Sequence, residues 1–127
     1  MVLSMRIAVG LVGLLNMLLG LGFLLRPVEV AARFALLPIG TQGLATIRAD
    51  FPAFFLTGAV FALLGAWRGD AKPLLVPLVL LSIALTGRCF SIATDGMVST
   101  TLPPMAAEAL MIAFILLARR AFLNATV

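Results

Sequence analysis

An uncharged apolar run from Ile7 to Leu25, nineteen residues long, constrains the fold of this chain more than any other feature. A helix rising ~1.5 Å per residue would carry this run across roughly 28 Å, close to the ~30 Å hydrocarbon core of a bilayer. The run exceeds the ~7–15-residue apolar segment of a secretory signal peptide. We therefore expect a membrane-spanning helix here and not a cleaved leader.

Three more apolar segments follow the first one. The chain is 63% hydrophobic and 11% charged, whereas soluble domains are only about half apolar. Backbone groups that face lipid must be satisfied within their own segment, which favours helices over irregular chain. Residues 1–127 are therefore predicted to form a single all-α integral membrane domain, a bundle of four transmembrane helices. The expected spans are approximately 5–25, 46–67, 73–95 and 102–119.

The segment between the first two spans is too short and too polar to cross a bilayer. Its apolar residues at helical spacing are Val30, Phe34 and Leu37. Glu29 precedes Arg33 by four residues, which is the favourable order for an ion pair on a helix. We predict a short interfacial helix over residues 28–37, lying flat on the membrane, with an ordered loop as the alternative.

Basic residues divide unevenly between the two sides of such a bundle. The side with both termini and the second loop would hold five basic residues: Arg6, Arg68, Lys72, Arg119 and Arg120. The opposite side would hold four: Arg26, Arg33, Arg48 and Arg88. Cytoplasmic loops carry the excess of Lys and Arg. We therefore predict a multi-pass membrane protein with both termini in the cytoplasm.

The charged and sulfur-containing residues exclude several classes of function. The net charge of +4 comes from 9 basic and 5 acidic residues scattered singly, without the basic patch that nucleic acid requires. The chain has no histidine and one cysteine, which excludes imidazole bases, histidine-ligated haem or zinc, and an intrachain disulfide. A lone thiol and dispersed carboxylates make no ligand set for soft metals. We expect no metal, no cofactor and no nucleic-acid partner.

Ionisable residues occur at membrane depth, where they are costly and mark a functional site by default. They are Asp50, Arg88 and Glu108. Glu108 lies near the expected midplane and must be paired with Arg88, protonated, or exposed to a water-filled pocket. We predict that Arg88 pairs with an acidic residue in the bundle, first Glu108 and otherwise Asp50 or Asp95. The alternative is that Arg88 extends to the interface and only anchors its helix.

Polar and small residues share one face of each of two spans. The stripe on the third span is Pro77, Leu81, Ala84, Arg88, Ser91 and Asp95. On the first span, Gly13, Asn16 and Gly20 align, and small residues at this spacing let helix backbones approach closely. For Asn16 a packing contact is favoured over a ligand contact. The polar stripes are expected to face one another.

Two residues at the start of the second span have alternative roles. Asp50 lies beside Pro52 and either caps the first turn of the helix or has a functional role, and these alternatives stay open. Arg48 is favoured as an interface anchor. The predicted ligand-binding set is Arg88, Glu108, Asp50, Asn16, Asp95 and Arg48, with Asp50 and Glu108 as candidate catalytic residues.

A family resemblance covers most of the chain. It rests on TIRADFPAFFLTGAVFALLGAW, on LTGRCFSIATDG and on a glutamate in the last span. These segments resemble the bacterial membrane family called domain of unknown function 4345, itself similar to the DoxX-like four-helix membrane proteins. The most specific parts are Arg48-Ala49-Asp50, Gly87-Arg88, Asp95-Gly96 and Glu108. Members typically have glycines where this chain has Pro52-Ala53. The resemblance implies a four-span fold, this polar set and a place in the bacterial cytoplasmic (inner) membrane, and no particular activity.

Two classes of function fit these features. In the first, the helices enclose a pocket that binds an amphipathic or lipid-like molecule at the Arg, Asp and Glu residues, with acid and base chemistry open to it. In the second, the chain is an accessory or assembly subunit whose charges are purely structural and whose partners are copies of itself or other membrane subunits. An oligomeric proton-coupled exporter is a third class. A closed ion-pair network would favour the structural role, and an open cavity beside Glu108 would favour ligand binding.

Overall fold

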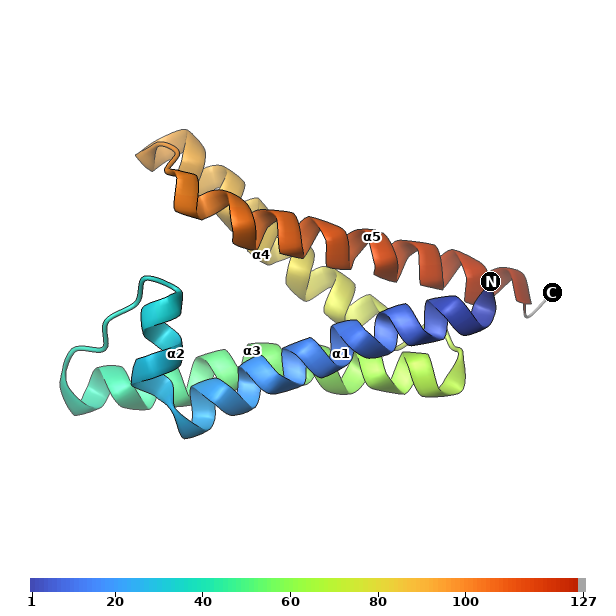
Figure 1. The fold of residues 1–127 in the computed structure, drawn as a ribbon, viewed down its shortest axis with the longest axis horizontal. Coiled ribbons are helices and arrows are strands. Elements are labelled where there is room, and N and C mark those ends of the chain that lie inside the picture. The colour runs from blue at the N-terminus through green and yellow to red at the C-terminus, as the bar shows by residue number, and fades with distance from the viewer. Residues whose placement is uncertain (126–127) are drawn as a thin grey trace.

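The computed structural model describes residues 1–125, and every regular element in that range is helical (Figure 1). The elements are α1 (Val2–Leu25), α2 (Pro27–Arg33), α3 (Gly40–Arg68), α4 (Leu75–Asp95), the 3-10 helix η1 (Ser99–Thr101) and α5 (Leu102–Ala125). Within the described residues, α1, α3, α4 and η1 with α5 are long and apolar enough to cross a membrane. The predicted all-α fold with four apolar spans is confirmed, and its architecture is that of a multi-pass membrane protein.

The second span is longer than predicted. Helix α3 begins at Gly40, so Asp50 lies well inside the helix and has no place in its first turn. The capping role considered for Asp50 is therefore wrong. Pro52 is buried inside the same helix and can donate no backbone hydrogen bond to the carbonyl of Arg48. Membrane helices tolerate such a proline because neighbouring groups satisfy the freed carbonyl.

The predicted interfacial helix is only partly present. Helix α2 starts with a proline at its first position and ends at Arg33, four residues before the predicted end at 37. Ala35 then adopts a left-handed backbone with φ of 58°. The ion pair also differs from the expected one, because Arg26 pairs with Glu29 across 3.4 Å. Within residues 1–125, the guanidinium of Arg33 has no ion-pair partner.

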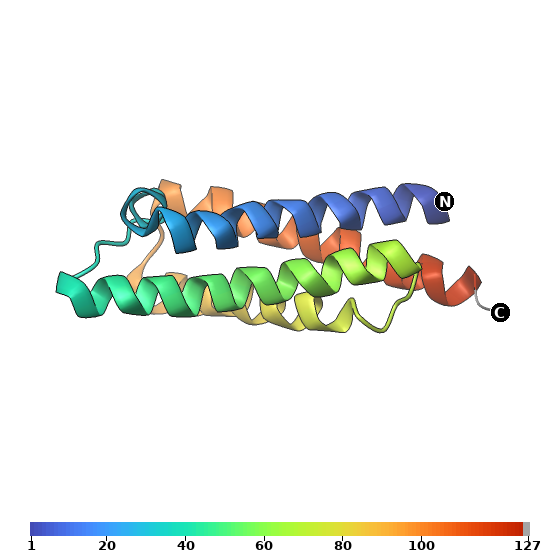
Figure 2. The ribbon, with the colours of Figure 1, turned by 90° about the horizontal axis from the view of Figure 1, so that it is seen from below.

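The helices form two pairs that diverge. Helix α1 packs chiefly against α3, whereas α5 packs to a similar extent against α1 and α4. Both termini and the α3–α4 loop lie at one end, which we call the proximal end, while α2 and η1 lie at the opposite, distal end (Figures 1 and 2). In Figure 1 the α4–α5 pair turns away from the α1–α3 pair toward the distal end. The bundle is therefore closed proximally and splayed distally.

Arginines close the proximal end by satisfying backbone carbonyls. Arg6 Nε donates to the carbonyl oxygen of Ala66 at 2.7 Å, and its Nη2 donates to that of Trp67. Arg119 Nη1 donates to the carbonyl oxygen of Ala71. Carbonyls at and after a helix C-terminus lack helical N–H partners, so these side chains replace them. The basic residues that were predicted to share one side do gather at this end.

The buried core explains why the pairs separate distally. The proximal cluster draws on all four long helices: Val9, Val12, Ala62, Ala66, Ala71, Leu74, Leu81, Ile115, Ala118, Ala121 and Phe122. The distal cluster is built from α1, α2 and α3, with Phe23, Ala31 and Ile47 buried at its centre. Apolar packing thus holds α4 and α5 to the other helices near the termini. Farther out, a different contact must hold α4 and α5 together.

A pair of glycine substitutions tests the close approach of α1 and α3. A Cβ added at Gly20 would lie 2.6 Å from Leu56 Cδ2, whereas one added at Gly87 would meet no atom within 4 Å. We expect Gly20→Ala to lower the free energy of unfolding by about 1–3 kcal/mol through overpacking. Gly87→Ala should leave it unchanged or raise it by up to about 1 kcal/mol, since alanine favours the helix. Denaturation in mixed detergent micelles followed by circular dichroism measures both, and equal effects would contradict tight α1–α3 packing.

Candidate functional site

An ion pair joins α4 to α5 beyond the proximal core. Arg88 Nε lies 3.0 Å from Glu108 Oε1 and 3.1 Å from Oε2, so a single N–H is shared by both carboxylate oxygens. The side chain of Glu108 is 12% exposed and that of Arg88 is 33% exposed. The predicted pairing of Arg88 with Glu108 is confirmed. Because both oxygens of Glu108 accept from Nε, the carboxylate holds the guanidinium in one orientation.

The outer edge of the Arg88 guanidinium is free. Its Nη1 and Nη2 groups make no hydrogen bond or ion pair with any residue in the range 1–125. An arginine presents its N–H donors as a rigid fork that matches carboxylate or phosphate oxygens. The pair with Glu108 therefore leaves a preoriented set of donors for another group.

A cavity of about 320 Å³ brings the three membrane-depth ionisable residues together. We call it the inner pocket, and its lining residues are Phe34, Asp50, Phe51, Phe54, Phe55, Ala84, Arg88 and Glu108. Asp50 reaches it from α3, Arg88 from α4 and Glu108 from α5. The carboxylate of Asp50 makes no ion pair or hydrogen bond within the described residues. The longer α3 places Asp50 here, on the side of a helix instead of at its start.

A second cavity of about 540 Å³ adjoins the first, and we call it the outer pocket. Its lining residues are Arg33, Phe34, Ala35, Arg88, Ser91, Val98, Thr100, Thr101, Pro103 and Pro104. Phe34 and Arg88 line both pockets and so form their common wall. Among the described residues, the ionisable side chains of the outer pocket are both arginines. Sequence reasoning did not place Arg33, Thr100 or Thr101 at the site.

Aromatic stacking supports the wall of the inner pocket. The fully buried ring of Phe23 lies 4.7 Å from that of Phe51, 5.3 Å from that of Phe34 and 5.6 Å from that of Phe55, measured between centroids. Phe23 belongs to α1, so a helix that does not reach the pocket fixes three of its lining rings. The rings of Phe23, Phe34, Phe51 and Phe55, which we call the distal aromatic cluster, therefore include three rings that line the inner pocket.

The other predicted site residues lie elsewhere. Asn16 is 4% exposed and donates from Nδ2 to the Val12 carbonyl at 2.9 Å and to Met111 Sδ at 3.6 Å, which is the packing role favoured for it. Arg48 is exposed on α3. Asp95 ends α4, where its carboxylate accepts a hydrogen bond of 2.9 Å from Ser91 Oγ. The structure brings Asp50, Arg88 and Glu108 together and leaves Asn16 and Arg48 apart from them. Asp95 lines neither pocket, but it is hydrogen-bonded to Ser91, which lines the outer one.

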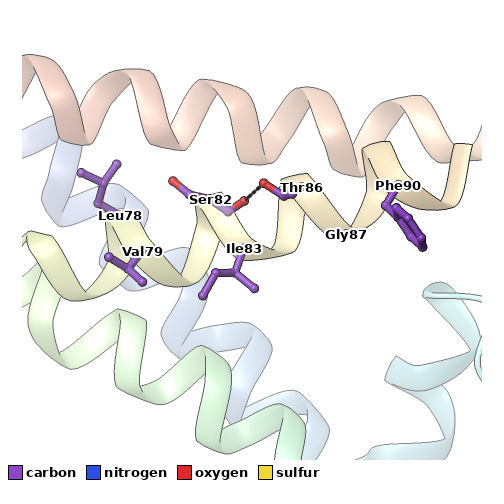
Figure 3. A pocket seen from close by; sticks show the side chains of 7 residues that line it. All are labelled: Leu78, Val79, Ser82, Ile83, Thr86, Gly87 and Phe90. Carbon is purple, nitrogen blue, oxygen red and sulfur yellow. Dashed lines mark hydrogen bonds between the residues drawn. The ribbon is translucent and has the colours of Figure 1, made fainter. Parts of the chain in front are cut away.

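A further hollow of about 700 Å³ lies along α4 and has a different character (Figure 3). Its lining residues are Leu78, Val79, Ser82, Ile83, Thr86, Gly87 and Phe90. The Thr86 hydroxyl donates to the Ser82 carbonyl at 2.7 Å, so its proton is already used within the helix. Among the described residues, no charged side chain lines this hollow, in contrast to the inner and outer pockets. This apolar face of α4 suits contact with lipid chains better than recognition of a head group.

No protein-family model, curated protein or solved structure matches this chain. The resemblance to the domain of unknown function 4345 stays a prediction. Within residues 1–125, no group of three or more His, Cys, Asp and Glu side chains could hold a metal ion. Function must therefore be inferred from the two pockets and the ion pair between them.

Proposed function

We propose that this chain is a small inner-membrane protein, with both termini in the cytoplasm, that binds an amphipathic, lipid-like molecule at Arg88. The observation that carries the proposal is the free edge of the Arg88 guanidinium, held by Glu108 at the common wall of two adjacent pockets. An anionic head group would accept hydrogen bonds from Nη1 and Nη2. The apolar tail would lie against the phenylalanines and extend into the surrounding lipid.

The chemistry of the pair suits this role. Hydrogen bonds between a guanidinium and an anion are charge-assisted, and a bidentate pair is stronger and more directional than a neutral contact. Glu108 neutralises Arg88 when the pocket is empty and fixes the direction of its donors. Glu108 is therefore a positioning residue for head-group binding. The free Asp50 carboxylate is the group in the inner pocket that could accept a proton from a bound molecule.

The alternative role, as an accessory subunit with purely structural charges, requires a closed ion-pair network. The Arg88–Glu108 pair instead lines a cavity, and Asp50 in the same cavity is unpaired within residues 1–125. Ligand binding accounts for both of these features.

Filling the inner pocket should weaken binding while both residues of the ion pair stay in the sequence. Ala84 lines the inner pocket, and Ala113 is exposed on α5 and serves as the matched control. The probe is lysophosphatidylglycerol, added to protein purified in dodecylmaltoside and followed by native mass spectrometry. We expect Ala84→Phe to weaken its binding at least about tenfold, equivalent to about 1.4 kcal/mol, and Ala113→Phe to leave it unchanged. Arg88→Lys, which keeps a cation beside Glu108 but loses the fork, should weaken binding similarly.

Unchanged probe binding in both Ala84→Phe and Arg88→Lys would exclude the pocket as the binding site. A wild-type protein that fails to bind the probe would exclude anion recognition at Arg88. In either case the charges would be structural, and the accessory-subunit role would replace this proposal.

A further inference from the structure

The two adjacent pockets differ in charge. The ionisable groups that line the outer pocket are Arg33 and Arg88, accompanied by the hydroxyls of Thr100 and Thr101. The hydroxyl of Ser91, which also lines it, donates to the carboxylate of Asp95 at 2.9 Å, and Asp95 does not line the pocket itself. The inner pocket holds two carboxylates, of Asp50 and Glu108, against the single guanidinium of Arg88. Since Glu108 already binds Arg88, the outer pocket retains an excess of positive charge and the inner pocket retains the negative charge of Asp50.

Asp50 is exposed on α3 and has no cation beside it within residues 1–125. It precedes Arg68, the proximal end of α3, by eighteen residues (68 − 50), or roughly 27 Å at the helical rise. This depth is near the distal boundary of a ~30 Å hydrocarbon core. Carboxylates at membrane depth usually pair with another group or face a cavity, and Asp50 faces one without a partner in residues 1–125.

The rings around Asp50 suit a cation. Phe34, Phe51, Phe54 and Phe55 all line the inner pocket, and the rings of Phe54 and Phe55 meet edge to face with centroids 5.1 Å apart. An ammonium group is attracted to aromatic ring faces, and this attraction grows when water is excluded. A carboxylate with several aromatic rings is therefore a favourable environment for an ammonium group.

We infer that the amphiphile carries a zwitterionic head group, with its anionic group between Arg33 and Arg88 and its ammonium group against Asp50. This inference rests on the proposed function and specifies its ligand. An anionic head group without an amine leaves Asp50 unmatched, and a cationic head group meets two arginines. Only a head group of both charges complements the two pockets, which meet at Phe34 and Arg88.

Matched probes separate the two charges. Lysophosphatidylethanolamine and lysophosphatidylglycerol of one acyl chain share a phosphodiester and differ in the amine. We expect the wild-type protein in dodecylmaltoside to bind the ethanolamine lipid about tenfold more tightly, by native mass spectrometry. Asp50→Asn should remove this preference by weakening the ethanolamine lipid alone. Arg33→Gln should weaken both lipids, and Asp70→Asn, at the proximal end, should change neither.

Several outcomes would overturn the inference. Equal binding of the two lipids by the wild-type protein, or equal weakening of both by Asp50→Asn, would exclude an ammonium site at Asp50. Anion binding at Arg88 would survive that result. Failure of both lipids to bind would instead overturn the proposed function. Phosphoethanolamine without a tail distinguishes a soluble zwitterion, because its binding as tightly as the lipid would contradict an amphiphilic ligand.

Discussion

Replacing Arg88 with leucine is expected to lower the free energy of unfolding by about 3–5 kcal/mol, the cost of leaving a buried charge without its partner. Glu108 would remain 12% exposed inside the bundle with no cation beside it. The loss should be large because the pair directly joins α4 to α5 beyond the core that all four long helices share. Denaturation by sodium dodecyl sulfate in mixed micelles, followed by circular dichroism, measures this change.

Two controls separate the ion pair from a general effect of charge removal. Arg33→Leu removes an exposed arginine that has no ion-pair partner in residues 1–125, and it should change stability by no more than about 0.5 kcal/mol. The double variant Arg88→Leu with Glu108→Leu should regain most of the lost stability, because a buried pair replaced by apolar residues is often neutral. If Arg88→Leu and Arg33→Leu were equally mild, the guanidinium of Arg88 would be acting only as an interface anchor.

The spans and the ion pair could be predicted because each follows from a strong local constraint. Long uncharged runs can satisfy their backbone in lipid only as helices. The pair could be predicted because Glu108 lies too deep to reach water and Arg88 is a cation in the adjoining span. The alignment of Gly13, Asn16 and Gly20 likewise predicted the buried face of α1. These features depend on residue type and spacing within one helix or between neighbouring helices.

The start of α3 could not be predicted because local residues favoured the wrong boundary. Asp50 and Pro52 together resemble the first turn of a helix, where an acid and a proline are both favourable. In the folded bundle the proline is buried and accommodated inside a longer helix. The pairing of Glu29 failed for a related reason, because Arg26 lies equally within reach and takes the carboxylate. The preferences of neighbouring residues along the chain do not identify the start of a helix or the partner in an ion pair when tertiary packing decides between two options.

The pockets depend on the angle between the α1–α3 pair and the α4–α5 pair. The spacing of residues along the sequence does not indicate this angle. The pockets exist because the core that joins all the long helices ends before the distal half of the bundle. That divergence brings Arg33 from α2 and Thr100 and Thr101 from η1 to the same cavity as Arg88. Short connecting segments have no periodic pattern from which one could predict that their residues line a site elsewhere in the fold. Their part in the site follows only from the folded structure.

The distal aromatic cluster gives the other large expected effect. Phe23→Ala should lower the free energy of unfolding by about 3 kcal/mol, since it removes a fully buried ring and leaves a cavity. Within a bilayer, packing contacts of this kind supply much of the attraction between helices. Phe90→Ala is the matched control, because its ring is 71% exposed on α4 and should cost no more than about 0.5 kcal/mol. The same detergent denaturation measures both variants.

Binding of lysophosphatidylglycerol to the Phe23→Ala protein tests whether the cluster also shapes the pocket. Phe23 lies outside the inner pocket but stacks on the rings of Phe34, Phe51 and Phe55, which line it. Loss of this support should let the rings move and weaken probe binding severalfold under conditions where circular dichroism shows the helices intact. Equal stability losses in Phe23→Ala and Phe90→Ala would show that the cluster does not hold α1 to α3. Unaltered binding in a destabilised Phe23→Ala protein would show that the pocket wall does not depend on Phe23, so that stability and recognition are separable in the distal half.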